Sequence, residues 1–259
     1  MKHHFFRASS VVLGAASLVL APARASFTEV NLTPQANADI QTYTGGSNYQ
    51  LGGTTLNVAG VPFALGQYDT PSNPTGAATT GVVQSGGGGT SFTFSMAPNT
   101  YATEVYTLMN TAWGSLGTDE ANIIVTGSHG ETATLDLVEG QNIRDHFNDG
   151  FVNTLTDGSV VSTYFSGGSV APTGTDRLDR QSFVLPSTFS GDTISSITFK
   201  ALSASYPNGA PFLAGLTLAN SNTVPDVPSA AVPVLAALAL LMAARFFEPN
   251  RTVCESQHS

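Results

Sequence analysis

Short runs of alternating apolar and polar residues fill the chain between residues 51 and 219. Val105 and Met109 share one face of such a run, and Leu108 lies on the other. A period of two is the period of a β-strand, and turn sequences rich in Gly, Asp and Asn separate the runs. The pattern predicts an all-β chain of about eight to ten strands, folded as an antiparallel β-sandwich of the jelly-roll type.

The sequence Ile123–Val138 predicts a β-hairpin within this sandwich. Two runs rich in β-branched residues flank the turn Ser128-His129-Gly130, as expected for neighbouring antiparallel strands. His129 is expected to be exposed in that turn. By contrast, Gly66–Gly89 is rich in glycine and proline and is expected to be an irregular surface loop, because it has little to bury.

The N-terminus has the three parts of a secretory signal peptide. Lys2 and Arg7 provide positive charge, Ala8–Pro22 is apolar, and Ala23-Arg24-Ala25 has the small residues that precede a cleavage site. The alternative is an N-terminal membrane anchor, for which the apolar run is short. We therefore expect residues 1–25 to be removed during export.

A long uncharged segment lies near the C-terminus. Val227–Ala244 contains 18 residues without an ionisable side chain and is followed by Arg245. As a helix it would extend about 27 Å, just short of the hydrocarbon core of a bilayer, and a basic residue at its end fits the positive-inside rule. The segment predicts a hydrophobic C-terminal helix that anchors the protein in a membrane. A buried helix is the weaker alternative, because the run is apolar all round.

Residues 26–223 form the predicted β-sandwich domain and are strongly acidic. They contain four cations against fifteen carboxylates, a net charge of −11. Nucleic acid is excluded as a partner, because contacts to phosphate need a basic patch. The single cysteine, Cys254, lies outside this domain, so its stability has to come from a buried core and not from disulfides.

One tryptophan and a polar cluster form the predicted ligand site. Asn142, Arg144 and Asp145 offer an amide, a guanidinium and a carboxylate, and Trp113 stands at the end of a predicted strand. Sugar-binding sandwiches use such polar groups for hydroxyls and stack a pyranose on an aromatic ring. We therefore expect carbohydrate binding at these four residues. The alternative is that Trp113 plugs the end of the core, where large aromatic side chains are usually found.

No cofactor is expected, although one ion site stays open. Asp145, Asp149 and Asp157 offer the oxygen ligands of an irregular Ca²⁺ site. Their spacing does not match the EF-hand pattern. The alternative is that these residues form turns through hydrogen bonds from their side chains to the backbone.

The sequence shows no catalytic constellation. The sandwich domain has two histidines, His129 and His146, and no Gly-x-Ser-x-Gly motif. Glycoside hydrolysis would require a pair of carboxylates. The candidates are Glu131, Asp136, Glu139, Asp176 and Asp179. The adjacent residues Asp176/Arg177 and Asp179/Arg180 are expected to form surface ion pairs. A non-enzymatic protein is favoured; the alternatives are a secreted hydrolase acting on polysaccharide and a purely structural surface protein.

The spacing of the predicted strands resembles that of a family of binding modules. The segments LNVAGVPFAL, VYTLMNTAWG, LVEGQNIRDH, DRLDRQSFVLP and FLAGLTL are similar to galactose-binding-like jelly-roll domains, over most of Leu51–Ala219. The resemblance implies a jelly roll and contact with carbohydrate. It implies no particular ligand residue, because ligand residues differ widely within that group.

The C-terminal segment, residues 224–259, resembles the PEP-CTERM sorting signal of Gram-negative bacteria. Val224-Pro225-Asp226-Val227-Pro228 stands where that family has Val-Pro-Glu-Pro, and the apolar run and Arg245 follow. Phe246–Ser259 replaces the terminal basic cluster of the family. The resemblance implies cleavage by exosortase, a membrane protease. It also implies transfer to the cell surface or the extracellular space, and contact with extracellular polysaccharide.

Overall fold

Strand formation follows the alternating sequence pattern through most of the chain. The computed structural model describes residues 25–44, 49, 52–68, 79–84, 89–147, 150–165, 176–203 and 209–221. All of them lie within the compact unit Ala25–Thr223. The predicted C-terminal helix and residues 1–24 of the predicted signal peptide lie outside the described residues. Among the described helices, none is both long and apolar enough to cross a membrane.

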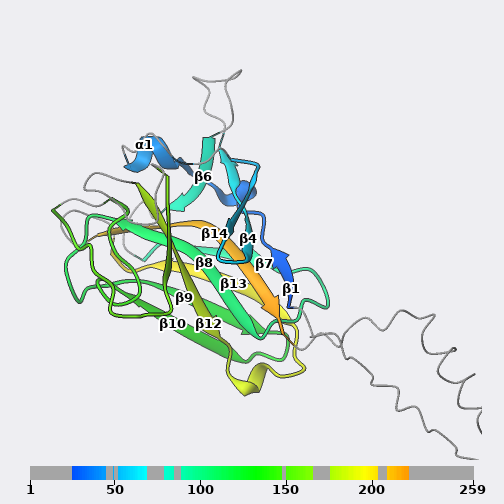
Figure 1. Cartoon of the computed structure of the whole chain (residues 1–259). Helices are drawn as coiled ribbons and strands as arrows, with labels where there is room; N and C mark the ends of the chain where they lie inside the picture. The colour runs from blue at the N-terminus through cyan, green and yellow to red at the C-terminus, as the bar shows by residue number, and fades with distance from the viewer. Residues whose placement is uncertain are drawn as a thin grey trace, which may run out of the picture. The chain divides into compact units, whose positions relative to one another are not determined.

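The larger of two stacked sheets has eight strands and is built around β8 and β14 (Figure 1). Its order is β11-β12-β8-β14-β6-β2, with β1 beside β14 and β5 beside β6, and every pairing is antiparallel. The strand bounds are β1 Ser26–Glu29, β2 Ala38–Asp39, β5 Gly66–Tyr68, β6 Thr79–Gln84, β8 Glu104–Ala112, β11 Val161–Tyr164, β12 Arg177–Val184 and β14 Ala210–Asn220.

The smaller sheet has four antiparallel strands in the order β10-β9-β13-β7. The strand bounds are β7 Ser91–Ser95, β9 Asp119–Gly127, β10 Thr132–Val138 and β13 Ile194–Ala201. The predicted hairpin over Ile123–Val138 is confirmed, because β9 and β10 pair from Thr126↔Thr132 onwards. Two short 3₁₀ helices, η1 (Thr33–Gln35) and η2 (Ser187–Phe189), connect strands.

Apolar side chains from the facing sides of the two sheets form the main core. Val105 and Met109 of β8 pack there with Ile123 and Phe199 of the smaller sheet. Leu108 points to the opposite side and belongs to a second apolar cluster, so the predicted faces of this strand are confirmed. The all-β class and the antiparallel sandwich are confirmed with them.

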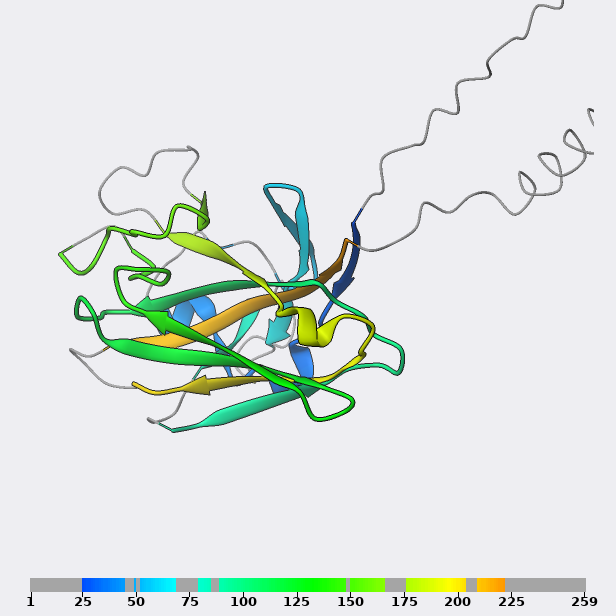
Figure 2. The same cartoon turned by 90° about the horizontal axis from the view of Figure 1, so that it is seen from below.

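A further layer covers the outer face of the larger sheet. The hairpin of β3 (Thr55–Val58) and β4 (Val61–Ala64) and the short helix α1 (Ile40–Thr44) lie on this side, away from the smaller sheet (Figure 2). Phe63 packs there in the same cluster as Phe212 of β14. Ten of the eleven residues of β14 are therefore buried. Burial on both faces explains why its sequence is a nearly continuous apolar run.

The expectation of a continuous loop over Gly66–Gly89 is wrong in part. Its described residues include β5 and β6, which pair at Gly66↔Gly81. The described residues form fourteen strands, whereas eight to ten were expected, and β1, β2, β5 and β6 are among the additional ones. Pairing to a neighbouring strand uses backbone groups, so a glycine-rich segment joins a sheet without an alternating side-chain pattern.

Candidate functional site

Arg144, one of the predicted ligand residues, is buried in an ion pair. Its Nε donates to Asp179 Oδ2 at 2.7 Å, and its Nη2 donates to Asp179 Oδ1 at 3.1 Å. Asn110 of β8 donates to the same carboxylate at 2.9 Å. Asp179 is fully buried in β12, so the expected surface pair between Asp179 and Arg180 is wrong. Arg180 instead donates to the carbonyl of Val58 at 3.2 Å.

Asp176 and Arg177 are also buried, so the second expected surface pair is wrong as well. Arg177 donates to the backbone carbonyl of Asp145 at 2.9 and 2.7 Å, and to Asn153 Oδ1 at 2.6 Å. Asp176 Oδ1 lies 3.9 Å from His146 Nδ1. Burial, and then the charge of Arg177, lowers the pKa of His146 to about 4. These contacts fix the loop that carries Asp145 against the start of β12.

The structure brings Trp113 and Asp145 together through the backbone of Trp113. The Trp113 amide donates to Asp145 Oδ2 at 2.5 Å, and the Phe147 amide donates to Oδ1 at 2.7 Å. The Asn142 side chain accepts from the Val138 amide at 2.8 Å and closes the turn after β10. The polar members of the predicted set thus have partners inside the protein. Trp113 is 38% exposed and supplies the accessible surface of the set.

The residues of the expected Ca²⁺ site form turns where the structure describes them. Asp145 accepts from the amide two residues later, and Asp157 does the same from the Ser159 amide at 2.8 Å. Such bonds are the turn-forming use of aspartate that stood as the alternative. Asp149 lies outside the described residues.

Two buried glutamates have strongly raised pKa values. Burial, and then the charge of Glu120, raises the pKa of Glu139 to about 9. Glu139 lies against Gly114, where a Cβ would come within 2.7 Å of Oε1. Burial also raises the pKa of Glu120 to about 7, a residue that the sequence did not single out. Neither glutamate lines the two cavities described next.

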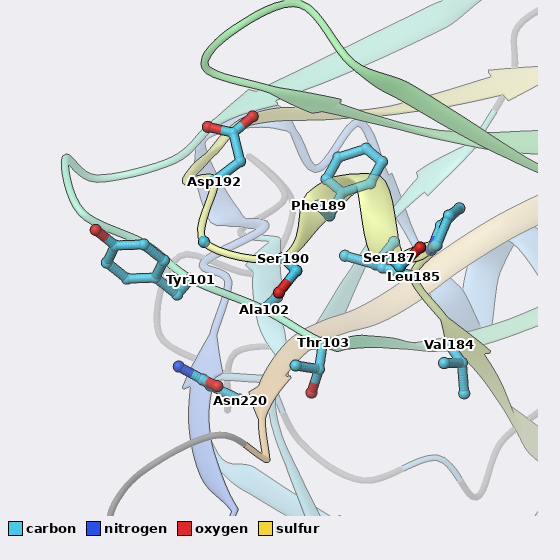
Figure 3. A pocket seen from close by; sticks show the side chains of 12 residues that line it. Tyr101, Ala102, Thr103, Val184, Leu185, Ser187, Phe189, Ser190, Asp192 and Asn220 are labelled. Atoms are coloured by element: carbon cyan, nitrogen blue, oxygen red, sulfur yellow. The ribbon is translucent and has the colours of Figure 1, made fainter.

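A cavity of about 360 Å³ lies at the end of the sandwich where β12 and β14 end. Tyr101, Asp192 and Asn220 all line it, but in Figure 3 the Asp192 carboxylate points away from the other two side chains. Tyr101 is 45% exposed, whereas Phe189 of η2 is buried and belongs to the core. The cavity therefore combines an exposed aromatic ring with the Asn220 amide, whereas the Asp192 carboxylate is hydrogen-bonded to Ser128 and to the Thr193 amide.

No sequence pattern pointed to this cavity, because three separate segments of the chain line it. They are residues 101–103, 184–192 and 220, and each by itself reads as an ordinary loop or strand end. A second cavity, of about 330 Å³, lies between residues 28–35 and 94–100. Phe94, its aromatic lining residue, is buried, so this cavity offers no exposed ring.

A cluster of three possible metal ligands adjoins the first cavity through Asp192. One ligand atom from each of His129, Glu131 and Asp192 lies within 4.8 Å of the other two. His129 Nδ1 lies 2.8 Å from Asp192 Oδ1. The prediction that His129 is exposed is confirmed, since 76% of its side chain is accessible. Asp136, a further carboxylate considered for hydrolysis, is exposed on β10 and accepts from Asn122 at 2.7 Å.

Comparison with known proteins adds no relative to this description: no protein-family model, curated protein or solved structure matches the chain.

Proposed function

We propose that the protein is an exported, non-enzymatic β-sandwich that binds carbohydrate at the cell surface or in the extracellular matrix. The observation that carries the proposal is the exposed ring of Tyr101 at the mouth of a cavity of about 360 Å³. Asn220 and the exposed Ser187 line the same cavity (Figure 3). This cavity replaces the Trp113 loop as the preferred ligand site, because Arg144 and Asp145 beside Trp113 are buried, whereas Ser187 at the cavity is exposed.

The chemistry of the lining suits a pyranose. A sugar ring has an apolar face of C–H groups that stacks on an aromatic side chain, worth about 0.5–1.5 kcal/mol beyond burial of area. Its hydroxyls then need donors and acceptors at the rim, which Ser187 and Asn220 provide. The volume lies at the small end of the range for ligand sites, about 300–1,000 Å³. We therefore assign it one sugar unit or the end of a glycan chain.

The path of the chain supports a jelly-roll assignment of the sandwich. Successive strands pass from the larger sheet at β8 to the smaller at β9 and β10, return at β11 and β12, and cross again through β13 to β14. Crossing between sheets in this way is a property of jelly rolls and Greek keys. It agrees with the resemblance to galactose-binding-like modules.

Export and sorting are part of the same proposal. The signal-peptide pattern ending at Ala25 supports secretion. The apolar run before Arg245, preceded by Val224-Pro225-Asp226, supports membrane anchoring and then cleavage by an exosortase-type protease. Mass spectrometry of the envelope form tests the first step, and an N-terminus at Ser26 is the expected result. An intact Met1 in the envelope would contradict export with cleavage.

Binding is tested by a glycan array and then by calorimetry with the hits. We expect Tyr101→Ala to weaken binding several-fold and to change the melting temperature little, because the ring is half exposed. Phe27→Ala is the matched control: Phe27 is 38% exposed but lies outside the cavity. Trp113→Ala tests the residue that the sequence favoured.

The possible outcomes separate the candidate functions. Loss of binding in Trp113→Ala, with Tyr101→Ala unchanged, would move the site to the Trp113 loop. No binding to any glycan would favour a purely structural surface protein. New reducing ends released from a polysaccharide would favour the hydrolase, and would direct attention to Glu139 and Glu120.

A further inference from the structure

Three side chains with metal-binding atoms meet beside the tip of the β9–β10 hairpin. His129 and Glu131 belong to the turn itself, and Asp192 comes from the segment that leads into β13. Each offers one ligand atom within 4.8 Å of the others. The cluster thus brings the hairpin turn together with a distant part of the sequence: His129 and Asp192, which are hydrogen-bonded, are 63 positions apart in the chain.

The two carboxylates of the cluster are packed against each other over Gly127. A Cβ at Gly127 would lie 2.3 Å from Asp192 Oδ2 and 3.0 Å from Glu131 Oε2. Glu131 Oε2 is buried, and no hydrogen-bond donor in the described part of the chain reaches it. Two carboxylates so close cannot both be ionised unless a cation or a shared proton lies between them. The position without a side chain at Gly127 is what leaves room for both.

Asp192 is held in position by the surrounding hydrogen bonds. Ser128 Oγ donates to Oδ1, as does the Thr193 amide at 2.7 Å, and the His129 amide lies 3.4 Å from Oδ2. The carboxylate is 6% exposed and fixed in place, as expected for a preorganised ligand.

We propose that His129, Glu131 and Asp192 bind a divalent transition-metal ion of the Zn²⁺ class. One imidazole nitrogen and two carboxylates are ligands that Zn²⁺ accepts, whereas Ca²⁺ and Mg²⁺ prefer sets made of oxygen alone. The ion balances the two negative charges and gives Glu131 Oε2 its missing partner. Bonds of about 2.0–2.2 Å keep any two ligand atoms within about 4.4 Å, so a small rotation of the exposed His129 side chain completes the site.

Metal binding at this site ties the hairpin tip to the segment before β13. The ion would stabilise the folded protein by mass action, because the three ligands are assembled only after folding. Asp192 also lines the proposed sugar cavity. The site nevertheless stands on its own residues and holds whether or not a glycan binds.

The test is a metal titration of the full chain, purified in detergent and stripped of metal with a chelator. Calorimetry with ZnCl₂ should give one ion per chain and a rise in melting temperature, and CaCl₂ at the same concentration should give neither. His129→Ala and Glu131→Gln should each weaken Zn²⁺ binding at least about tenfold, because loss of a residue that only supports a metal ligand already costs about 10–100-fold. His129 is largely exposed, so its replacement leaves the fold intact, which circular dichroism checks.

Asp136→Asn is the matched control. It removes one exposed carboxylate from β10 of the same hairpin, outside the cluster, and should leave Zn²⁺ binding unchanged. No stoichiometric Zn²⁺ binding to the wild-type chain would overturn the proposal, as would binding that survives both His129→Ala and Glu131→Gln. A proton shared between Glu131 and Asp192 is the rival, and it predicts a melting temperature that depends on pH and not on metal.

Discussion

At the scale of single residues, the unusual groups are carboxylates taken away from water. Glu139 and Glu120 are fully buried, and each has a hydroxyl neighbour, Thr111 and Ser203 respectively. Desolvation disfavours their charged forms, which is why their pKa values rise to about 9 and about 7. Strongly raised pKa values often mark functional sites, but here they have a direct consequence for stability.

The raised pKa of Glu139 makes the folded state less stable at high pH. The folded protein keeps a proton that the unfolded chain loses above about 4.5, the ordinary value. The stabilising contribution is therefore complete below that pH and is lost as pH rises through about 9. Glu139→Gln should flatten the decline between pH 7 and pH 9, as measured by urea unfolding. His146, with a pKa of about 4, does not titrate in this window, and equal slopes in the two proteins would contradict the assignment.

Gly127 is a residue where one added carbon should matter. Gly127→Ala places a Cβ against the carboxylates of Asp192 and Glu131, so we expect a loss of about 1–3 kcal/mol, typical of overpacking. Zn²⁺ binding should fall with it. Gly158→Ala is the control, because a Cβ there meets nothing within 4 Å. Thermal unfolding measures both variants, and an unchanged melting temperature in Gly127→Ala would show that the carboxylates are not held as described.

At the scale of elements, buried polar contacts tie the loop after β10 to the larger sheet. Arg144 pairs with Asp179 of β12, and Asn110 of β8 bonds the same carboxylate. Arg144 also donates to Ser162 of β11 at 2.7 Å. The predicted ligand cluster is therefore part of the scaffold that joins three strands to a loop.

Breaking the Arg144–Asp179 pair should destabilise the protein strongly. Removal of one partner from a buried pair leaves an uncompensated charge and costs about 3–5 kcal/mol. Asp179→Asn should lose stability in this range in chemical denaturation, whereas exposed Asp157→Asn should change it by less than about 1 kcal/mol. The double variant Arg144→Met/Asp179→Leu should lose less than the sum of the single changes. If Asp179→Asn has only a small effect on the free energy of unfolding, Asp179 and Arg144 do not form the buried ion pair described here.

At the scale of the whole molecule, the larger sheet is the centre of the fold. The smaller sheet packs on one face, and the β3–β4 hairpin and α1 lie on the other (Figures 1 and 2). The proposed sugar cavity and the proposed metal site both use Asp192. A sandwich of this kind presents loops at its ends on a rigid support, which suits a binding protein.

Membrane attachment through the C-terminal run is a prediction for the complete protein. Replacement of Leu238 and Leu241 by Asp should release the protein from membranes, because a charge at mid-helix costs about 2.5–3.5 kcal/mol on insertion scales. Replacement of both leucines by alanine is the control and should leave attachment intact. Fractionation followed by immunoblotting reads the result. If the Asp variant stays in the membrane fraction, the anchor lies elsewhere.

Local properties of the chain were readable from the sequence. The two faces of β8 and the β9–β10 hairpin follow from alternation, because side chains of a strand point to opposite sides in turn. The exposure of His129 follows from its position in a turn. Alternation is lost where both faces are buried, as in β14, and it is absent where glycine-rich segments such as β5 pair through the backbone.

Only the tertiary structure decided which charged groups meet. Asp179 looked like the partner of adjacent Arg180, but strand geometry turns neighbouring side chains to opposite faces. Asp179 therefore points to Arg144, 35 positions away. The sugar cavity and the His129–Glu131–Asp192 cluster likewise combine segments that are far apart in the chain. A sequence pattern reports the environment of a residue along its own strand, whereas charge pairs, cavities and metal ligands are set by the packing of strands that the pattern does not connect.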